Sequence, residues 1–252
     1  MRSLLLLVIL MVSMTACGKR GPLYYPDMLV PAAPAITSSA QSGSSIKLQF
    51  VLPDKDRAGR KLSDLAGVKI NKRVSDTTQE QVCSSCMTDF RLFRKLNLGL
   101  LPEDAQRYGS SIVVIDGDVN VGKTYSSSVV PFTKDNIDGL ASPQVSISPV
   151  QPTSPPVLYA ESFPTEIRIS FVRPQAAGSF IGYNLYRTTQ LNVRSYLPVN
   201  REPLNGNEYI DSGLERNLGY YYMARTLVKL ESGAVVESPV SNVVEGMLKN
   251  DE

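Results

Sequence analysis

Two stretches of this chain, far apart in the sequence, alternate apolar and polar residues in the same way. Residues 46–53 read IKLQFVLP and residues 167–174 read IRISFVRP, with the apolar positions at identical spacing. Alternation with a period of two is typical of a β-strand that buries one face. The pattern therefore predicts two equivalent strands and indicates an internal repeat.

The repeat continues in unbroken order beyond these strands. Residues 66–72 (AGVKINK) match residues 181–187 (IGYNLYR), and residues 115–117 (IDG) match residues 210–212 (IDS). Farther on, residues 122–125 (GKTY) match residues 219–222 (GYYY), and Ser142-Pro143 matches Ser238-Pro239. The chain also has 17 prolines, 17 glycines and few apolar positions at helical spacing, so we expect an all-β fold with many turns.

The second copy resembles the fibronectin type III family, on the residues GYNLYR, YID, GYYY and SPVS in this order. The first copy is similar over a longer stretch, and Phe50 and Phe171 stand where that family usually has tryptophan. The resemblance implies two tandem fibronectin type III-like (Ig-like) β-sandwiches, each with two antiparallel sheets and about seven strands. We place them at residues 34–149 and 157–247, joined by a Pro-rich linker at 150–156 and followed by a tail at 248–252.

The first copy is about 20 residues longer than the second between matched strands, from Gly67 to Asp116 against Gly182 to Asp211. Part of this insertion, residues 90–96 (FRLFRKL), has apolar side chains at helical spacing beside three cations. We interpret it as a flap packed over the sandwich or, alternatively, as a patch that faces a membrane or a partner.

The same insertion contains Cys83 and Cys86. In an oxidising compartment, two cysteines three positions apart most simply form a local disulfide. A redox-active dithiol is an alternative and would need a thiol of lowered pKa. A metal site is the third interpretation, but it would need two further soft ligands, and the chain has no histidine and only three cysteines.

The amino-terminal residues predict export and lipid anchoring. Residues 1–16 combine Arg2, a short apolar run and small residues, which is typical of a signal peptide. Met14-Thr15-Ala16-Cys17 resembles a bacterial lipobox, in which the cysteine is diacylated and becomes the acylated first residue. We therefore expect lipidated Cys17 to hold the protein on a membrane. Gly18 after the cysteine favours sorting to the outer membrane.

Residues 17–33 are predicted to form a lipidated tether. Their start resembles the small outer-membrane lipoproteins that assist maturation of the lipopolysaccharide translocon, which share a C-G-x-x-G-P-L pattern followed by aromatic residues and proline. The resemblance implies a partner-binding segment made of Gly18, Gly21, Pro22, Leu23, Tyr24 and Pro26. The alternative is a plain tether whose tyrosines rest at the bilayer interface.

The segment GDVNVGKT, residues 117–124, fits the pattern of a phosphate-binding loop. Such a loop must run into a helix, whereas TYSSSVVPFT is rich in strand-forming residues. The repeat instead places Gly117 in a turn and Lys123 at the start of a strand, so we interpret the segment as a hairpin turn and expect no nucleotide partner.

Composition narrows the function classes. The absence of histidine removes every catalytic scheme with an imidazole base. The 26 basic and 24 acidic residues leave no excess of positive charge for binding nucleic acid. We therefore expect a non-enzymatic, membrane-anchored interaction or structural lipoprotein without a cofactor, with an envelope protein as its partner. An accessory factor of an outer-membrane β-barrel complex and a periplasmic thiol-redox protein are the alternatives.

Overall fold

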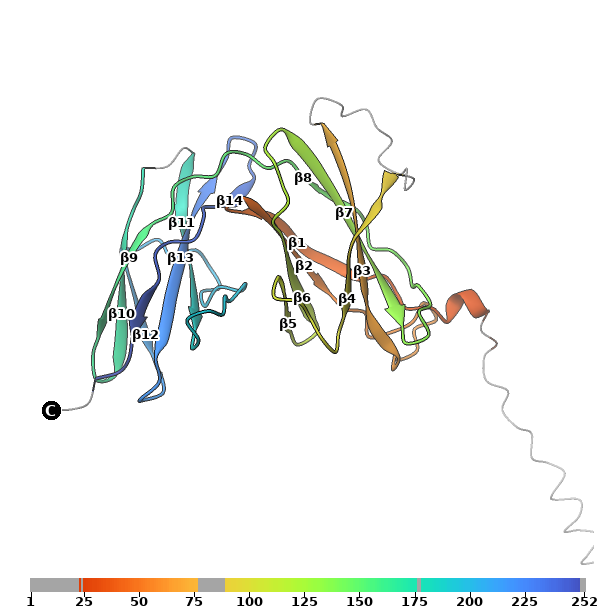
Figure 1. Cartoon of the computed structure of the whole chain (residues 1–252), viewed down its shortest axis with the longest axis horizontal. Coiled ribbons are helices and arrows are strands. Elements are labelled where there is room, and N and C mark those ends of the chain that lie inside the picture. Colours follow the sequence, from red (N-terminus) through yellow and green to blue (C-terminus); the bar gives the residue numbers. More distant parts are fainter. Residues whose placement is uncertain (1–22, 24, 77–88, 176–177, 250–252) are drawn as a thin grey trace, which may run out of the picture.

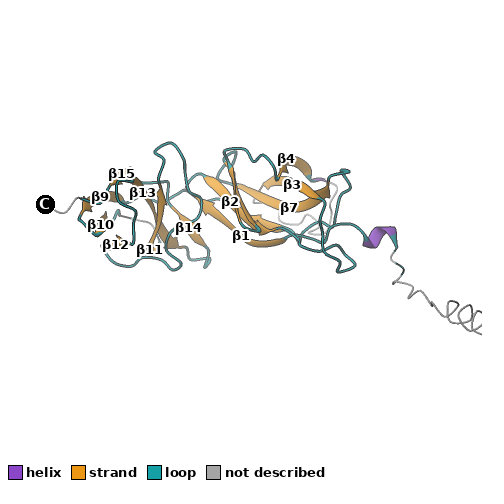
Figure 2. Ribbon diagram, turned by 90° about the horizontal axis from the view of Figure 1, so that it is seen from below, coloured by secondary structure: helices purple, strands orange, loops and turns teal. Residues whose placement is uncertain are grey.

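The computed structural model describes residue 23 and residues 25–76, 89–175 and 178–249. These residues form two β-sandwiches that follow one another along the long axis of the molecule (Figures 1 and 2). The only helix described, η2 (Pro26–Met28), lies at one end, and the described C-terminal residues lie at the other. The predicted all-β architecture of two tandem fibronectin type III-like sandwiches is confirmed.

The first sandwich packs two sheets face to face. One sheet has the order β1-β2-β6-β5 and the other has the order β4-β3-β7-β8, with antiparallel neighbours throughout. Its strands are β1 (Ala35–Ser42), β2 (Ser45–Val51), β3 (Leu65–Asp76), β4 (Arg91–Asn97), β5 (Ala105–Tyr108), β6 (Ser111–Asp116), β7 (Lys123–Thr133) and β8 (Val145–Ile147).

The second sandwich repeats this plan with fewer strands. A three-stranded sheet, β12-β10-β9, packs against a sheet in which β13 pairs with β11, β14 and β15. Its strands are β9 (Val157–Ser162), β10 (Glu166–Val172), β11 (Ser179–Thr188), β12 (Glu208–Ser212), β13 (Tyr220–Lys229), β14 (Val235–Glu237) and β15 (Val244–Gly246).

Each sandwich has a core of its own, built from the alternating residues that the sequence pattern marks. Phe50 is fully buried in the first core, and Phe171 is buried in the second, where its ring stacks on Tyr183 with 4.7 Å between the centroids. Both phenylalanines lie near the ends of the predicted equivalent strands, β2 and β10. The smaller ring therefore fills the position expected for tryptophan.

Equivalent glycines make the same bulge in both copies. The strand register shifts at Gly67 in β3 and at Gly182 in β11. A Cβ atom at Gly67 would lie 2.1 Å from the carbonyl oxygen of Leu96, and one at Gly182 would lie 2.8 Å from that of Leu204. Side chains are therefore excluded at both positions, which supports the matched repeat.

One sheet continues from the first sandwich into the second. Strand β14 lies beside β1 in a short parallel contact that pairs Ser42 with Glu237, and the backbone N–H of Gly43 donates to the carbonyl of Glu237 at 2.9 Å. The resulting order, β11-β13-β14-β1-β2-β6-β5, runs through both domains. The two sandwiches are thus joined by main-chain pairing as well as by the linker.

The structure corrects the interpretation of the inserted segment. Residues 91–97 form strand β4 at the edge of a sheet, and no helical flap is present among the described residues of the insertion. The register between β3 and β4 shifts at Phe93. Ile70 pairs with Arg94 and the next residue, Asn71, pairs with Leu92, so Phe93 is skipped in the pairing. This bulge interrupts the period of two and explains why the sequence imitated helical spacing.

Candidate interaction sites

The described part of the tether is docked on the first sandwich. Backbone bonds run from Ala58 to Met28, from Arg57 to Val30 and from Ala32 to Lys55, at 3.0–3.1 Å. An exposed ion pair between Arg57 and Asp27, at 3.3 Å, adds to them. Two residues described before this contact are open to solvent, since Leu23 is 99% exposed and Tyr25 is 77% exposed.

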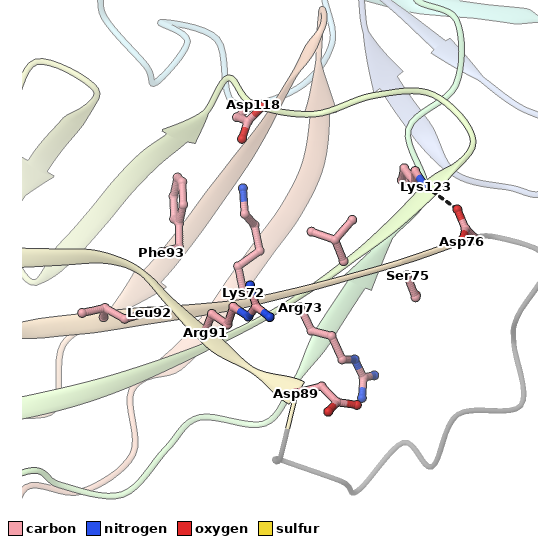
Figure 3. A pocket seen from close by; sticks show the side chains of 11 residues that line it. Lys72, Arg73, Ser75, Asp76, Asp89, Arg91, Leu92, Phe93, Asp118 and Lys123 are labelled. Atoms are coloured by element: carbon pink, nitrogen blue, oxygen red, sulfur yellow. Dashed lines mark hydrogen bonds and ion pairs between the residues drawn. The ribbon is translucent and has the colours of Figure 1, made fainter.

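A groove of about 800 Å³ lies at the other end of the first sandwich, where β3 ends and β4 and β7 begin (Figure 3). Four cations and three carboxylates line it, together with Val74, Leu92 and Phe93. The charged residues are Lys72, Arg73, Arg91, Lys123, Asp76, Asp89 and Asp118.

Two cations of the groove stand directly opposite each other across β3 and β4, Lys72 and Arg91. Like charges in this position destabilise a sheet unless something neutralises them. Lys72 is neutralised by Asp116 on the facing sheet, at 2.9 Å, and its ammonium lies 4.2 Å from the centre of the Phe93 ring. Arg91 is exposed beside it, so the groove has a guanidinium available to a partner.

This groove is suited to a polypeptide. It is open and mostly polar, whereas small-molecule sites are usually enclosed and apolar. Leu92 and Val74 are half exposed within it, and arginine is enriched where proteins bind one another. The groove therefore offers apolar, cationic and anionic contacts on one surface.

The segment GDVNVGKT joins two strands of the first sandwich. Strand β6 ends at Asp116 and β7 begins at Lys123, with Gly122 in the left-handed region at φ 85°. The predicted strand start at Lys123 is confirmed, but the hairpin is wrong, because β6 and β7 belong to different sheets. Lys123 forms an exposed ion pair with its register partner Asp76 (Figure 3).

The connection between β6 and β7 contains a tyrosine corner, and so does the equivalent connection between β12 and β13 in the second copy. The backbone N–H of Asn120 donates to the Tyr125 hydroxyl at 2.7 Å, and that of Glu215 donates to the Tyr220 hydroxyl at 2.8 Å. Such a corner is a hallmark of immunoglobulin-like sandwiches. The structure thus makes Tyr125 equivalent to Tyr220, so the sequence match of residues 122–125 to 219–222 was two positions out of register.

The same region carries an equivalent ion pair in each copy. Lys72 binds Asp116 in the first sandwich, and Arg187 binds Asp211 at 2.8 Å in the second. Each cation also lies near the ring of its corner tyrosine, at 5.6 Å and 5.5 Å. Within the described parts of the two copies, only the first has a further strand, β4, beside the pair, and this strand forms one side of the groove.

A second polar cluster joins the two sandwiches at Glu237 of β14. Its carboxylate accepts hydrogen bonds from Lys47 at 3.0 and 3.1 Å, from Tyr186 at 2.7 Å and from Asn184 at 2.6 Å. The Ser42 hydroxyl donates to Oε2 of this carboxylate, whereas Tyr186 and Asn184 donate to Oε1. We call this cluster the junction. Ser42 and Lys47 belong to the first sandwich, so the bonds cross the domain boundary.

The junction alters the ionisation of its members. Burial raises the pKa of the Glu237 carboxyl, but the Lys47 ammonium and the bonds from Ser42, Tyr186 and Asn184 outweigh it, so the pKa lies below its usual value. Burial and the adjacent carboxylate raise the pKa of Tyr186. Glu237 is therefore a buried anion whose donors come from both sandwiches.

Two further contacts hold the sandwiches together. The Gln41 side chain pairs with the backbone of Val150 in the linker, accepting at 2.9 Å and donating at 2.6 Å. On the other side, the Tyr196 hydroxyl donates to the Glu103 carbonyl at 2.8 Å, and the Tyr196 N–H lies 3.1 Å from both Gln106 and Tyr108 oxygens. The domain boundary is thus bonded at three separate places.

Most of the residues predicted to carry chemistry lie outside the described residues. Of the expected partner-binding segment, Leu23 and Pro26 are described and lie at the outer end of the docked tether. The others, namely Cys17, Gly18, Gly21, Pro22, Tyr24, Cys83 and Cys86, are outside. The lipidation and the disulfide therefore stay predictions.

Sequence reasoning missed the junction and located the groove only in part. The alternative interpretation of residues 90–96 as a partner-facing patch includes Arg91, Leu92 and Phe93, which line the groove, but the sequence pattern concealed the edge strand β4 that forms it. The junction joins Ser42 to a residue 195 positions away, and a single sequence contains no signal for that pairing.

Two further kinds of site are absent from the described residues. Within them, no helix is both long and apolar enough to cross a membrane. In that same part of the chain, no three acidic or cysteine side chains gather where they could hold a metal ion.

Comparison with known proteins assigns neither a family nor a function to this chain. No protein-family model matches the chain, and no curated protein matches it in sequence. A solved structure of the FN1–FN3 domains of chicken CNTN1 is similar at 13% identity and a TM-score of 0.33, covering 87% of this chain and 69% of that one. The fold assignment rests on the strand order and the tyrosine corners described above.

Proposed function

We propose that this chain is a lipid-anchored, non-enzymatic protein of the bacterial outer membrane whose two sandwiches act as one rigid protein-interaction module. The junction carries the proposal. Neighbouring domains in a chain normally move relative to one another unless their interface is extensive. Here Glu237 of one domain is buried against Lys47 of the other, and main-chain pairing continues between them.

The docked tether and the groove both belong to the first sandwich, so their separation is fixed. The tether docks near the end of β3 that begins at Leu65. In this region the backbone N–H of Leu140 donates to the carbonyl of Pro31. The groove lies at the Asp76 end of the same strand, roughly 35 Å away at about 3.3 Å per residue. An anchor at Cys17 would therefore place the groove on the side away from the membrane, where a soluble or peripheral partner reaches it.

The polar residues favour binding over catalysis. The Ser42 hydroxyl donates a hydrogen bond to the Glu237 carboxylate. Of the contacts at the domain boundary, this pair most resembles a catalytic nucleophile with its base. Both groups are buried, and Glu237 is also bound by Lys47, Asn184 and Tyr186. These donors lower the pKa of the Glu237 carboxyl, which makes it a weak proton acceptor for the Ser42 hydroxyl.

The experiment is site-specific crosslinking in the native envelope. A photoreactive side chain replaces Leu92 in the groove or, as a matched control, Leu191 in the second sandwich, because these leucines are 57% and 58% exposed. We expect a specific crosslinked protein from position 92 and none from position 191. Equal or absent crosslinking at both positions contradicts the groove as the interaction surface.

The anchor is tested separately by cell fractionation of a Cys17→Ser variant. We expect the variant to leave the membrane fraction and its mass to lack acyl chains. Unchanged membrane retention together with an unchanged mass contradicts the lipoprotein part of the proposal, and it leaves the crosslinking result intact.

A second candidate function is that of an accessory factor of an outer-membrane β-barrel complex, such as the lipopolysaccharide translocon. The exposure of Leu23 and Tyr25 at the outer end of the docked tether favours it. Co-purification of such a barrel that is lost in the double variant Leu23→Ala, Tyr25→Ala, and retained in Val121→Ala, would support it. Retention in both variants contradicts it.

A further inference from the structure

A small cavity of about 100 Å³ lies between the two sandwiches, beside the junction. The first sandwich contributes Ser45 and Lys47 to its wall, and the second contributes Arg194 and Arg225. Boundaries between domains are preferred places for ligand sites. This cavity is separate from the groove of Figure 3 and from the tether, and neither proposed function uses it.

The wall of the cavity has an excess of positive charge. Lys47 and Arg225 lie near the buried Glu237 carboxylate, at 3.0 Å and 4.0 Å, and Arg194 adds a third cation. One anion therefore faces three cations. The three donors of the Lys47 ammonium are used by Glu237 and by the Tyr186 hydroxyl at 3.3 Å. Because Lys47 is paired with Glu237, the positive charge left in the wall lies on Arg194 and Arg225.

Both arginines keep hydrogen-bond donors for a ligand. A guanidinium has five N–H groups, and that of Arg225 spends one on the Ser238 carbonyl at 2.7 Å. The Arg194 guanidinium and the Ser45 hydroxyl make no hydrogen bond with the part of the chain that the structure describes. Guanidinium groups bind carboxylate and phosphate oxygens in a bidentate manner.

The segment that carries Arg194 is fixed by the opposite sandwich. The Gln106 amide donates to the Arg194 carbonyl, and Gln106 and Tyr108 oxygens accept from the N–H of Tyr196. Because the backbone of this segment is already fixed, less conformational entropy of the protein is lost when a ligand binds. Arg194 is thus positioned by residues 88 or more positions away in sequence.

The cavity is large enough for several water molecules, because one water needs only about 10–15 Å³ of such space. A single carboxylate or phosphate group therefore fits within it. From its charge, its free donors and its volume, we propose that the cavity is a binding site for a single small oxyanion, held by Arg194, Arg225 and the Ser45 hydroxyl across the domain boundary.

The test is an NMR titration of the isotope-labelled full chain, carrying Cys17→Ser, with inorganic phosphate and separately with acetate at constant ionic strength. We expect saturable shifts of the amides of Ser45, Arg194 and Arg225 with a millimolar dissociation constant. Arg194→Gln should weaken binding at least about tenfold, because a charge-assisted hydrogen bond is lost. Arg201→Gln, an exposed cation elsewhere in the second sandwich, should leave it unchanged.

The two anions separate the possible sources of the ligand. Saturation by acetate alone assigns the site to carboxylates, saturation by phosphate alone assigns it to phosphates, and saturation by both supports a general oxyanion site. Absence of saturable shifts overturns the proposal. Shifts that spread over the surface cations, or that persist in Arg194→Gln, overturn it as well.

Discussion

The carboxylate of Glu237 in the second sandwich lies 3.0 Å from the ammonium of Lys47 in the first, and only 5% and 13% of their side-chain areas are exposed. Removing one member of a buried ion pair leaves an uncompensated charge and typically costs about 3–5 kcal/mol. The contact therefore makes the stability of each sandwich depend on the other.

Replacement of Lys47 tests this dependence. We expect Lys47→Met to lower the free energy of unfolding by about 3 kcal/mol or more, because Glu237 would stay buried without its counter-ion. The matched control is Lys69→Met, since Lys69 forms an even shorter pair with Asp138, at 2.7 Å, that is more exposed. An exposed pair contributes about 0–1 kcal/mol. Equal losses in the two variants would contradict the role of the junction.

The pH dependence of stability follows from the lowered pKa of Glu237. In the unfolded chain this carboxyl takes up a proton at about pH 4.3, and in the folded chain it does so only at lower pH. The junction's contribution is therefore complete at neutral pH and is lost as the pH falls from about 4.3 through the folded pKa. Unfolding measured from pH 7 to pH 3 should show a weaker acid dependence in Glu237→Gln. Parallel curves for the two proteins contradict this.

The tyrosine corners predict equal behaviour of the two repeats. We expect Tyr125→Phe and Tyr220→Phe each to cost about 0.5–1.5 kcal/mol, the net value of one hydrogen bond. Tyr159→Phe, which alters an exposed ring on β9, should stay within about 0.5 kcal/mol of the parent. Thermal and chemical denaturation measure all three. A cost at one corner only would refute the structural equivalence of Tyr125 and Tyr220.

Lys123 tests the interpretation of GDVNVGKT. Among the described residues, its side chain pairs with Asp76 on the exposed surface, and this partner raises the Lys123 pKa. We expect Lys123→Ala to leave the unfolding midpoint unchanged, and neither protein to bind ATP or GTP in an isothermal titration. Nucleotide binding that the substitution abolishes would show that the segment is a phosphate-binding loop after all.

Alternation of apolar residues was enough to locate the strands that build the two cores. The stretches around Phe50 and Phe171 lie in β2 and β10, and those around Gly67 and Gly182 lie in β3 and β11. Strands β2 and β10 bury every second residue, and β3 and β11 alternate only after their glycine bulges, at Val68 and Ile70 and at Tyr183 and Leu185. Local pattern and final fold agree there because one buried face decides both.

Elsewhere, local pattern was not enough. The run Tyr220 to Tyr222 offers three tyrosines to match with Tyr125, and only the corner bond to Glu215 selects the first. The bulge at Phe93 changed the apparent period of β4. The junction and the cavity depend on side chains brought together by the packing of two domains, for which a single sequence has no local signal.

The distance between the two sandwiches tests the central claim most directly. Nitroxide labels at Asp135→Cys in the first sandwich and Ser232→Cys in the second, in a chain with Cys17, Cys83 and Cys86 changed to serine, report it by pulsed electron paramagnetic resonance. If the sandwiches form one rigid module, the distance distribution is a single narrow peak, and Glu237→Gln broadens it. A broad distribution in the parent chain would contradict the account, because the domains would then move independently.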